Sequence, residues 1–87
     1  MEGVASVSKD ILVGLIGFGT IGAGVVKLLR DNEELIRKRL GARLVIKKIA
    51  DIDIETPRPV KVDRAILTTD VQEVLTDPEI SIVVELV

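Results

Sequence analysis

The sequence predicts an α/β fold in which a parallel sheet of three to four strands is flanked by helices. The apolar run at residues 11–16 does not alternate with polar residues, which is typical of a strand buried on both faces. This run leads directly into Gly17-Phe18-Gly19-Thr20-Ile21-Gly22 and then into an amphipathic helical pattern. A strand, a G-x-G-x-x-G turn and a helix in this order indicate the mononucleotide-binding half of a dinucleotide-binding domain. We therefore expect a partial Rossmann fold over residues 11–87, preceded by a flexible leader at 1–10.

The helix that follows the glycine turn is predicted from about Thr20 toward Leu40. A polar patch at 31–34 interrupts its apolar stripe, so a kink or break is expected there. Gly41 is placed to serve as the C-terminal cap. The predicted stripe consists of Ile21, Val25, Val26, Leu29, Ile36 and Leu40.

Three further strands are predicted, at 44–50, at 65–67 and at 80–87. Two prolines make residues 54–63 a surface connection. Thr69 and Gln72 match a T-x-x-Q capping box, which predicts a short helix that ends before Asp77-Pro78. Right-handed crossovers place the first strand centrally, with 44–50 on one side of it and 80–87 on the other.

The glycine turn predicts a binding site for a dinucleotide. Gly17 allows the tight turn, Gly19 lets a pyrophosphate approach the backbone, and Gly22 lets the helix pack closely on the strand. Thr20 and Ile21 lie at the helix start, where free N–H groups and the helix dipole favour an anion. Phe18 is expected to offer its backbone to the cofactor, although its ring is either a cofactor contact or a core aromatic. The alternative is a glycine turn with a purely structural role.

Asp51 directly follows the second predicted strand, where an acid typically binds the adenosine ribose hydroxyls. It lies 34 residues after Gly17 rather than about 20, and the long helix explains the excess. The alternative is that Asp51 merely opens a turn with Asp53. Two carboxylates would repel the 2′-phosphate of NADP, so NAD is favoured slightly over NADP. Arg58 and Arg64 follow in the sequence, but nothing predicts where their side chains lie.

Three polar residues near the strand ends are candidates for the border of the cofactor site, and two of them, Thr69 and Glu85, have an alternative interpretation. Thr68 and Thr69 follow the short third strand and either border the adenine pocket or, for Thr69, cap the next helix, which is the favoured reading. Glu85 lies in the last strand and is either a polar group near the nicotinamide or an ordinary alternating residue.

Composition restricts the classes of function. Among the 87 residues there is no Cys and no His, which excludes disulfides, metal sites built from Cys or His, thiol catalysis and a His general base. The absence of Cys fits a reducing cytoplasm. A net charge of −2 predicts no broad basic surface for nucleic acid, and no apolar stretch approaches the ~20 residues of a membrane span.

The run from Val13 to Leu29 resembles the amino terminus of homoserine dehydrogenase. The pattern G-x-G-T-[VI]-G-x-G-V-V adds Thr20, Gly24 and the pair Val25-Val26 to the generic fingerprint, and the likeness covers residues 11–87. It implies an NAD(P)-dependent oxidoreductase of the aspartate pathway, which interconverts aspartate 4-semialdehyde and homoserine by hydride transfer. By matching positions, Phe18, Thr20 and Ile21 would contact the cofactor.

The resemblance also implies a fragment. The family continues beyond Val87 to a glycine pair, the rest of the sheet and the substrate region, so no residue here is assigned a catalytic role. We expect weak cofactor binding and no turnover from this chain alone. The open outer edge of residues 80–87 predicts self-association. The alternatives are a regulatory nucleotide-sensing module without catalysis, or a structural fragment only.

Overall fold

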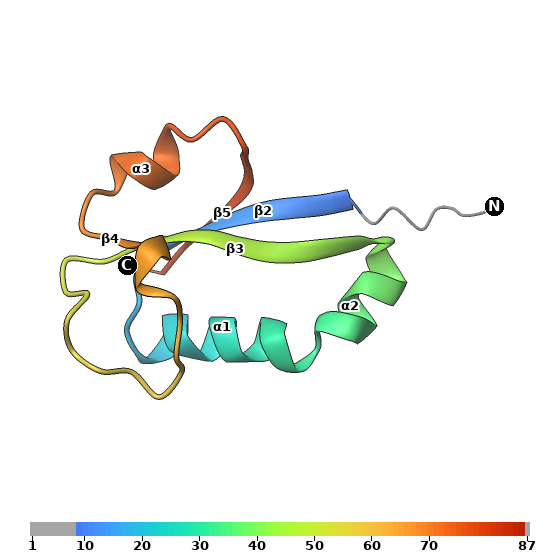
Figure 1. The fold of residues 1–87 in the computed structure, drawn as a ribbon, viewed down its shortest axis with the longest axis horizontal. Helices are drawn as coiled ribbons and strands as arrows, with labels where there is room; N and C mark the ends of the chain where they lie inside the picture. Colours follow the sequence, from blue (N-terminus) through green and yellow to red (C-terminus); the bar gives the residue numbers. More distant parts are fainter. Residues whose placement is uncertain (1–8, 87) are drawn as a thin grey trace.

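The computed structural model describes residues 9–86 and shows a four-stranded parallel sheet with helices on both faces (Figure 1). The strands are β2 (Lys9–Ile16), β3 (Ala42–Ala50), β4 (Leu67–Thr68) and β5 (Ile80–Glu85), in the spatial order β4-β3-β2-β5. Helices α1 (Thr20–Asp31) and α2 (Glu33–Leu40) lie along one face, and the short α3 (Gln72–Leu75) lies on the other. The partial Rossmann fold and the central place of the first strand are confirmed.

The central strand β2 is buried on both faces, as its unbroken apolar sequence predicted. Leu15 packs with Phe18, Ala23, Val26 and Ile49 in the cluster under α1. The next residue, Ile16, points to the opposite side and packs with Ala50 and Val74. Successive side chains of a strand alternate between faces, so one strand supplies both halves of the core. Strand β2 begins at Lys9, two residues before the predicted start.

The predicted long helix is broken at Asn32. The Asn32 backbone N–H donates to Leu28 O over 3.1 Å, and its side-chain amide donates to the same carbonyl over 2.9 Å. Asn32 therefore ends α1 while its own carbonyl accepts from Ile36 N and starts α2. Gly41 closes α2 with φ +69 and an N–H bond to Arg37 O, which confirms the predicted cap.

The prediction of an apolar stripe is wrong for two of its members, which are exposed. Ile21 is 70% exposed and Leu40 is 57% exposed, whereas Val26 is buried. Ile21 belongs to the first turn, at the rim of the sheet, and Leu40 belongs to α2, whose axis no longer follows that of α1 (Figure 1). A single helical period does not continue across a break, so the stripe cannot be extended from α1 into α2.

The second half of the chain differs from the prediction in two details. Residues Arg64–Ile66 form a 3₁₀ turn, and the third strand is only Leu67–Thr68. The predicted capping box is wrong, because α3 begins at Gln72 and it is Asp70 Oδ1 that accepts the Gln72 N–H over 2.9 Å. The last strand ends at Glu85. Val87 and residues 1–8 of the leader predicted at 1–10 lie outside the described residues, and residues 9 and 10 of that leader belong to β2.

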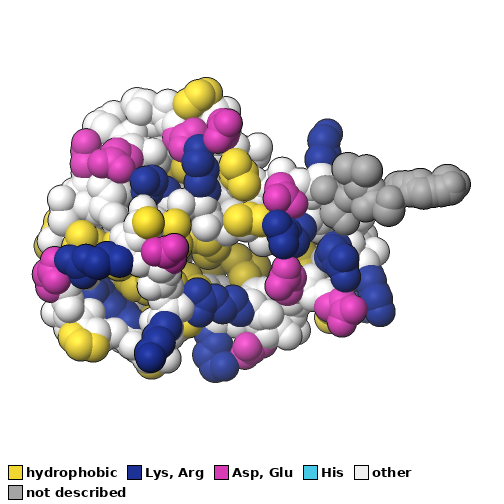
Figure 2. Space-filling model, viewed as in Figure 1, with side chains coloured by type: hydrophobic (Ala, Val, Ile, Leu, Met, Phe, Trp, Pro, Cys, Tyr) yellow, Lys and Arg dark blue, Asp and Glu magenta, His cyan; other side chains and the backbone are white. Residues whose placement is uncertain are grey.

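The connection from β3 to β4, residues 51–66, is irregular apart from the 3₁₀ turn Arg64–Ile66 and curves past the start of α1 (Figure 1). It leaves a hollow of about 220 Å³ between α1 and β3, whose apolar floor is visible in Figure 2. Charged side chains of both signs are interspersed over the surface around it. Within residues 9–86, no helix is long and apolar enough to cross a membrane.

Candidate functional site

The candidate site lies at the carboxyl ends of the parallel strands. Three backbone hydrogen bonds tie these ends together: Gly17 N–H to Ala50 O over 2.8 Å, Asp51 N–H to Thr68 O over 3.0 Å, and Leu86 N–H to Ile16 O over 2.9 Å. Parallel strands end at the same edge of a sheet, and that edge is where open α/β sheets bind ligands. A cleft of about 400 Å³ opens there, lined by Ile16, Gly17, Gly19, Ala50, Asp51, Ile52, Thr69, Val71 and Leu86.

Two of the three glycines are required by the geometry of the turn. Gly17 has φ +103, a conformation that side chains of L-residues rarely adopt, and it redirects the chain from β2 into α1. A Cβ on Gly22 would lie 2.3 Å from Gly17 O, so only glycine lets α1 start this close to the strand. Gly19 differs, because a Cβ there would meet no protein atom within 4 Å. The space beside Gly19 is therefore open to a ligand.

The start of α1 carries free hydrogen-bond donors. The first backbone bond of the helix runs from Ala23 N–H to Gly19 O, and no side chain of the described residues caps the helix. Its first turn contains no acidic residue, so nothing within the helix offsets the positive end of its dipole. Gly19, Thr20 and Ile21 are exposed. Gly19 lines the cleft, whereas Thr20 lines a neighbouring hollow of about 300 Å³ and Ile21 lines neither. The exposed start of α1 thus offers backbone donors of the kind that suits an anion.

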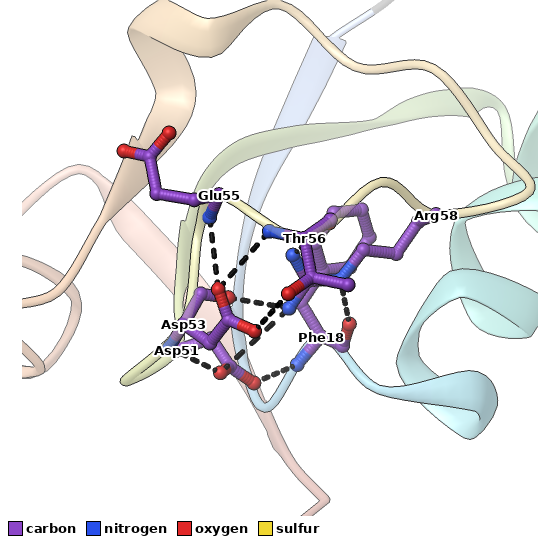
Figure 3. Close-up of polar contacts among 6 residues, drawn as sticks. All are labelled: Phe18, Asp51, Asp53, Glu55, Thr56 and Arg58. Atoms are coloured by element: carbon purple, nitrogen blue, oxygen red, sulfur yellow. Dashed lines mark hydrogen bonds and ion pairs between the residues drawn. The ribbon is translucent and has the colours of Figure 1, made fainter.

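Asp51 is brought against the glycine turn, as Figure 3 shows. Its Oδ2 accepts the Phe18 N–H over 2.6 Å, and its Oδ1 accepts the Asp53 N–H over 2.8 Å. Asp51 therefore does open a turn with Asp53, and it also holds the glycine turn in place. Because each carboxylate oxygen has a second lone pair, Asp51 retains the capacity to accept a ribose hydroxyl.

Phe18 has a core ring and a fully engaged backbone. The ring is 2% exposed and packs in the cluster that contains Leu15 and Ile49. Its N–H binds Asp51, and its carbonyl accepts from Arg58 Nε over 2.8 Å. The structure thus resolves the two readings of the ring in favour of the core.

Asp53 organises the loop that follows Asp51. Its carboxylate accepts the Thr56 hydroxyl and the backbone N–H groups of Thr56 and Glu55. These bonds stabilise the charged form and lower the pKa of Asp53 from 3.8 to about 2. Asp53 therefore stays ionised in the folded protein at any pH above about 4.

The sequence did not predict where Arg58 lies, nor that Ile52, Val71 and Leu86 line the cleft. The Arg58 side chain reaches back to the glycine turn from an irregular loop, and no local pattern in the sequence encodes such a contact. Thr69 lines the cleft instead of capping α3, while Glu85 pairs with Ile16 at the end of β5. Arg64 lies outside the site and pairs with Glu55.

Comparisons with known proteins give a consistent result. The family model described as homoserine dehydrogenase, NAD binding domain, matches residues 17–86. The homoserine dehydrogenase of Bacillus subtilis is 39% identical over 79 residues, which are 91% of this chain and 18% of that protein. That of Methylobacillus glycogenes is 40% identical over 79 residues, covering 91% of this chain and 19% of that protein.

Solved structures agree with this result. The crystal structure of S. aureus homoserine dehydrogenase at pH 7.5 superposes with a TM-score of 0.81 at 39% identity, covering 88% of this chain and 20% of that one. The enzyme from Thiobacillus denitrificans gives 0.77 at 38% identity, with 92% and 18% covered. The chain thus spans about a fifth of the length of the relatives it matches. The family model and these relatives, together with the glycine turn and the strand order, show that this chain belongs to the homoserine dehydrogenase family and corresponds to the NAD-binding domain of that family.

Proposed function

We propose that this chain binds the adenosine and pyrophosphate part of NAD(P) at the glycine turn. It would thereby serve as the cofactor-binding portion of an enzyme that interconverts aspartate 4-semialdehyde and homoserine by hydride transfer. The observation that carries the proposal is the uncapped start of α1, which opens beside Gly19 into a cleft bordered by Asp51.

Each site residue has a role in this proposal. Gly17 and Gly22 shape the turn, and Gly19 leaves space for the pyrophosphate. The N–H groups at Thr20 and Ile21 bind its oxygens. Phe18 anchors the turn through its backbone and its buried ring.

Asp51 is proposed to accept the adenosine ribose hydroxyls and to favour NAD. Its carboxylate would repel the 2′-phosphate of NADP, but Arg58 Nη2 lies 3.8 Å from Asp51 Oδ1 and offsets part of that charge. A residual repulsion of about 1 kcal/mol, typical of charges near water, corresponds to about fivefold tighter binding of NAD. Asp53 adds little, because its carboxylate is directed into its own loop.

The affinity is expected to be weak. The described residues supply contacts for one half of a dinucleotide, which corresponds to about 4–6 kcal/mol, or a dissociation constant from high micromolar to millimolar. We also propose that this chain alone does not catalyse the reaction and that it is located in the cytoplasm.

Self-association is a further part of the proposal. β5 is an edge strand of the sheet, and Ile82 and Val83 on it are 41% and 42% exposed. An apolar, β-branched edge offers unpaired backbone groups to a second strand. A second copy of the chain is therefore proposed to pair along β5.

A calorimetric titration with NAD and NADP tests the binding proposal. Gly19→Val is the decisive variant, because the new side chain meets no protein atom within 4 Å at its Cβ and fills the space meant for the pyrophosphate. Gly24→Val is the matched control, since Gly24 on α1 is equally open and lies one turn and a half further along the helix. We expect saturable binding in the wild type and in Gly24→Val, and none in Gly19→Val, with unchanged circular dichroism in all three. Equal binding by Gly19→Val would refute the site. If the folded wild type bound neither nucleotide, the alternative that the chain is only a structural fragment would hold.

A further inference from the structure

The loop between β3 and β4 places one arginine against the glycine turn. Arg58 lies 40 residues after Phe18, yet its Nε donates to Phe18 O over 2.8 Å. Its Nη1 donates to Thr56 O over 2.6 Å, and its Nη2 donates to Asp53 O. The guanidinium carbon also lies 4.9 Å from the centroid of the Phe18 ring. Figure 3 shows this side chain joining the loop to the turn.

We propose that Arg58 is a positioning residue for the dinucleotide, acting through the Phe18–Gly19 peptide without touching the cofactor. This inference rests on the proposed function, since it concerns how the same phosphate site is held.

The planarity of the peptide bond explains how Arg58 would act. In a trans peptide the carbonyl of Phe18 and the N–H of Gly19 point in opposite directions. Arg58 holds the carbonyl on its own side, so the Gly19 N–H is directed away from Arg58. Gly19 lines the 400 Å³ cleft, and Arg58 does not. The arginine therefore orients the first N–H donor of the phosphate site.

The two sides of Phe18 are fixed by opposite charges. Asp51 accepts the N–H of Phe18 over 2.6 Å, and Arg58 donates to its carbonyl over 2.8 Å. Both peptide planes of Phe18 are thus held, and the buried ring prevents the residue from rotating. Preorganised donors bind an anion more tightly than donors that must first be ordered.

The geometry argues against a direct ligand role for Arg58. Three of its five N–H groups donate to backbone carbonyls, and its side chain is 11% exposed. It does line a second hollow of about 300 Å³ together with Gly19 and Thr20, so a direct contact to a 2′-phosphate is the alternative that an experiment must separate. Lysine could not replace it in the proposed role, because an ammonium is a single point donor and does not match three carbonyls with a planar fork.

The test compares Arg58→Met and Arg58→Lys with Arg64→Met as the matched control. Arg64 lies in the same connection, but its side chain is 66% exposed and pairs with Glu55. Titrations followed by NMR would measure the dissociation constants of ADP, adenosine and adenosine 2′,5′-bisphosphate. The amide signal of Gly19 in the free protein gives a second readout that needs no ligand.

The proposal predicts that both Arg58 variants bind ADP about tenfold more weakly, the expected loss for one well-oriented bond to a charged group, while adenosine binding changes little. The Gly19 amide should become more mobile in both, and Arg64→Met should match the wild type. Unchanged ADP affinity and an unchanged Gly19 amide, or rescue by lysine, would overturn the proposal. A loss confined to adenosine 2′,5′-bisphosphate would also overturn it, in favour of a direct phosphate ligand. If the wild type binds no nucleotide, the proposed function fails, and the free-state Gly19 amide still decides whether Arg58 orders the turn.

Discussion

The contact between the glycine turn and α1 gives the most quantitative prediction. Gly22→Ala places a Cβ 2.3 Å from Gly17 O and 3.1 Å from its carbonyl carbon, whereas real Cβ contacts essentially never fall below 3.0 Å. The clash is with backbone, and Gly17 is held by its bond to Ala50 O and by φ +103. The start of α1 would have to move outward, and overpacking of this kind costs about 1–3 kcal/mol.

Gly24→Ala is a control that cancels the effect of helix propensity. Both glycines lie in α1, and alanine in a helix interior is favoured over glycine by about 0.5–1 kcal/mol. A Cβ on Gly24 meets nothing within 4 Å, so this variant should gain that amount. The difference in unfolding free energy between the two variants is therefore the clash itself, about 1–3 kcal/mol.

The assay is urea denaturation followed by circular dichroism, supported by thermal melts. For a domain of this size, 1 kcal/mol corresponds to about 4–8 °C in Tm, so Gly22→Ala should melt at least several degrees below Gly24→Ala. Equal stability of the two variants would refute the argument that close approach requires glycine at position 22.

Two further predictions concern charge and the sheet edge. The pKa of Asp53 is about 2 when folded, below its ordinary 3.8, so its contribution to stability is complete above about pH 4 and is lost as the pH falls toward 2. The melting temperature of the wild type should therefore fall more steeply between pH 4 and pH 2 than that of Asp53→Asn, and parallel curves would contradict this. Val83→Lys places a charge on the exposed edge strand β5 and should shift sedimentation profiles toward monomer. A wild type that stays monomeric at high concentration would exclude pairing along β5.

Local patterns in the sequence predicted the strands and the glycine turn because the relevant forces are local. The unbroken apolar run before Gly17 requires burial on both faces, and the handedness of crossovers then orders the sheet. The break at Asn32 was also expected from the polar patch around it. These features depend on residues that are close in sequence.

The errors arose where tertiary contacts decide between local alternatives. Thr and Asp are both favourable residues before a helix, so Thr69 and Asp70 were both candidates. The path of the chain after β4 brings the Asp70 carboxylate, and not the Thr69 hydroxyl, to the Gln72 N–H. Ile21 fits the helical stripe, but it lies in a first turn that projects toward the cleft end of the sheet and stays exposed. No period or propensity carries this information.

The candidate site shows the same limit. The position of Asp51 directly after the second predicted strand identified it as a candidate site residue. Its hydrogen bond to the Phe18 N–H, however, depends on how closely β3 and the glycine turn approach each other. The place of the Arg58 side chain could not be predicted, because its contact with Phe18 spans 40 residues and comes from a loop without regular structure. Proline on both sides of Arg58 restricts the backbone but does not determine where the side chain reaches.

The most direct test of the central claim is an NMR titration of the isotopically labelled chain with NAD. A bound pyrophosphate at the start of α1 should shift the amide signals of Gly19, Thr20 and Ile21 most strongly and with a single saturable dissociation constant. Saturable shifts confined instead to the apolar hollow between α1 and β3, around Val26 and Ile46, would contradict the account. So would the absence of any saturable shift in the folded protein.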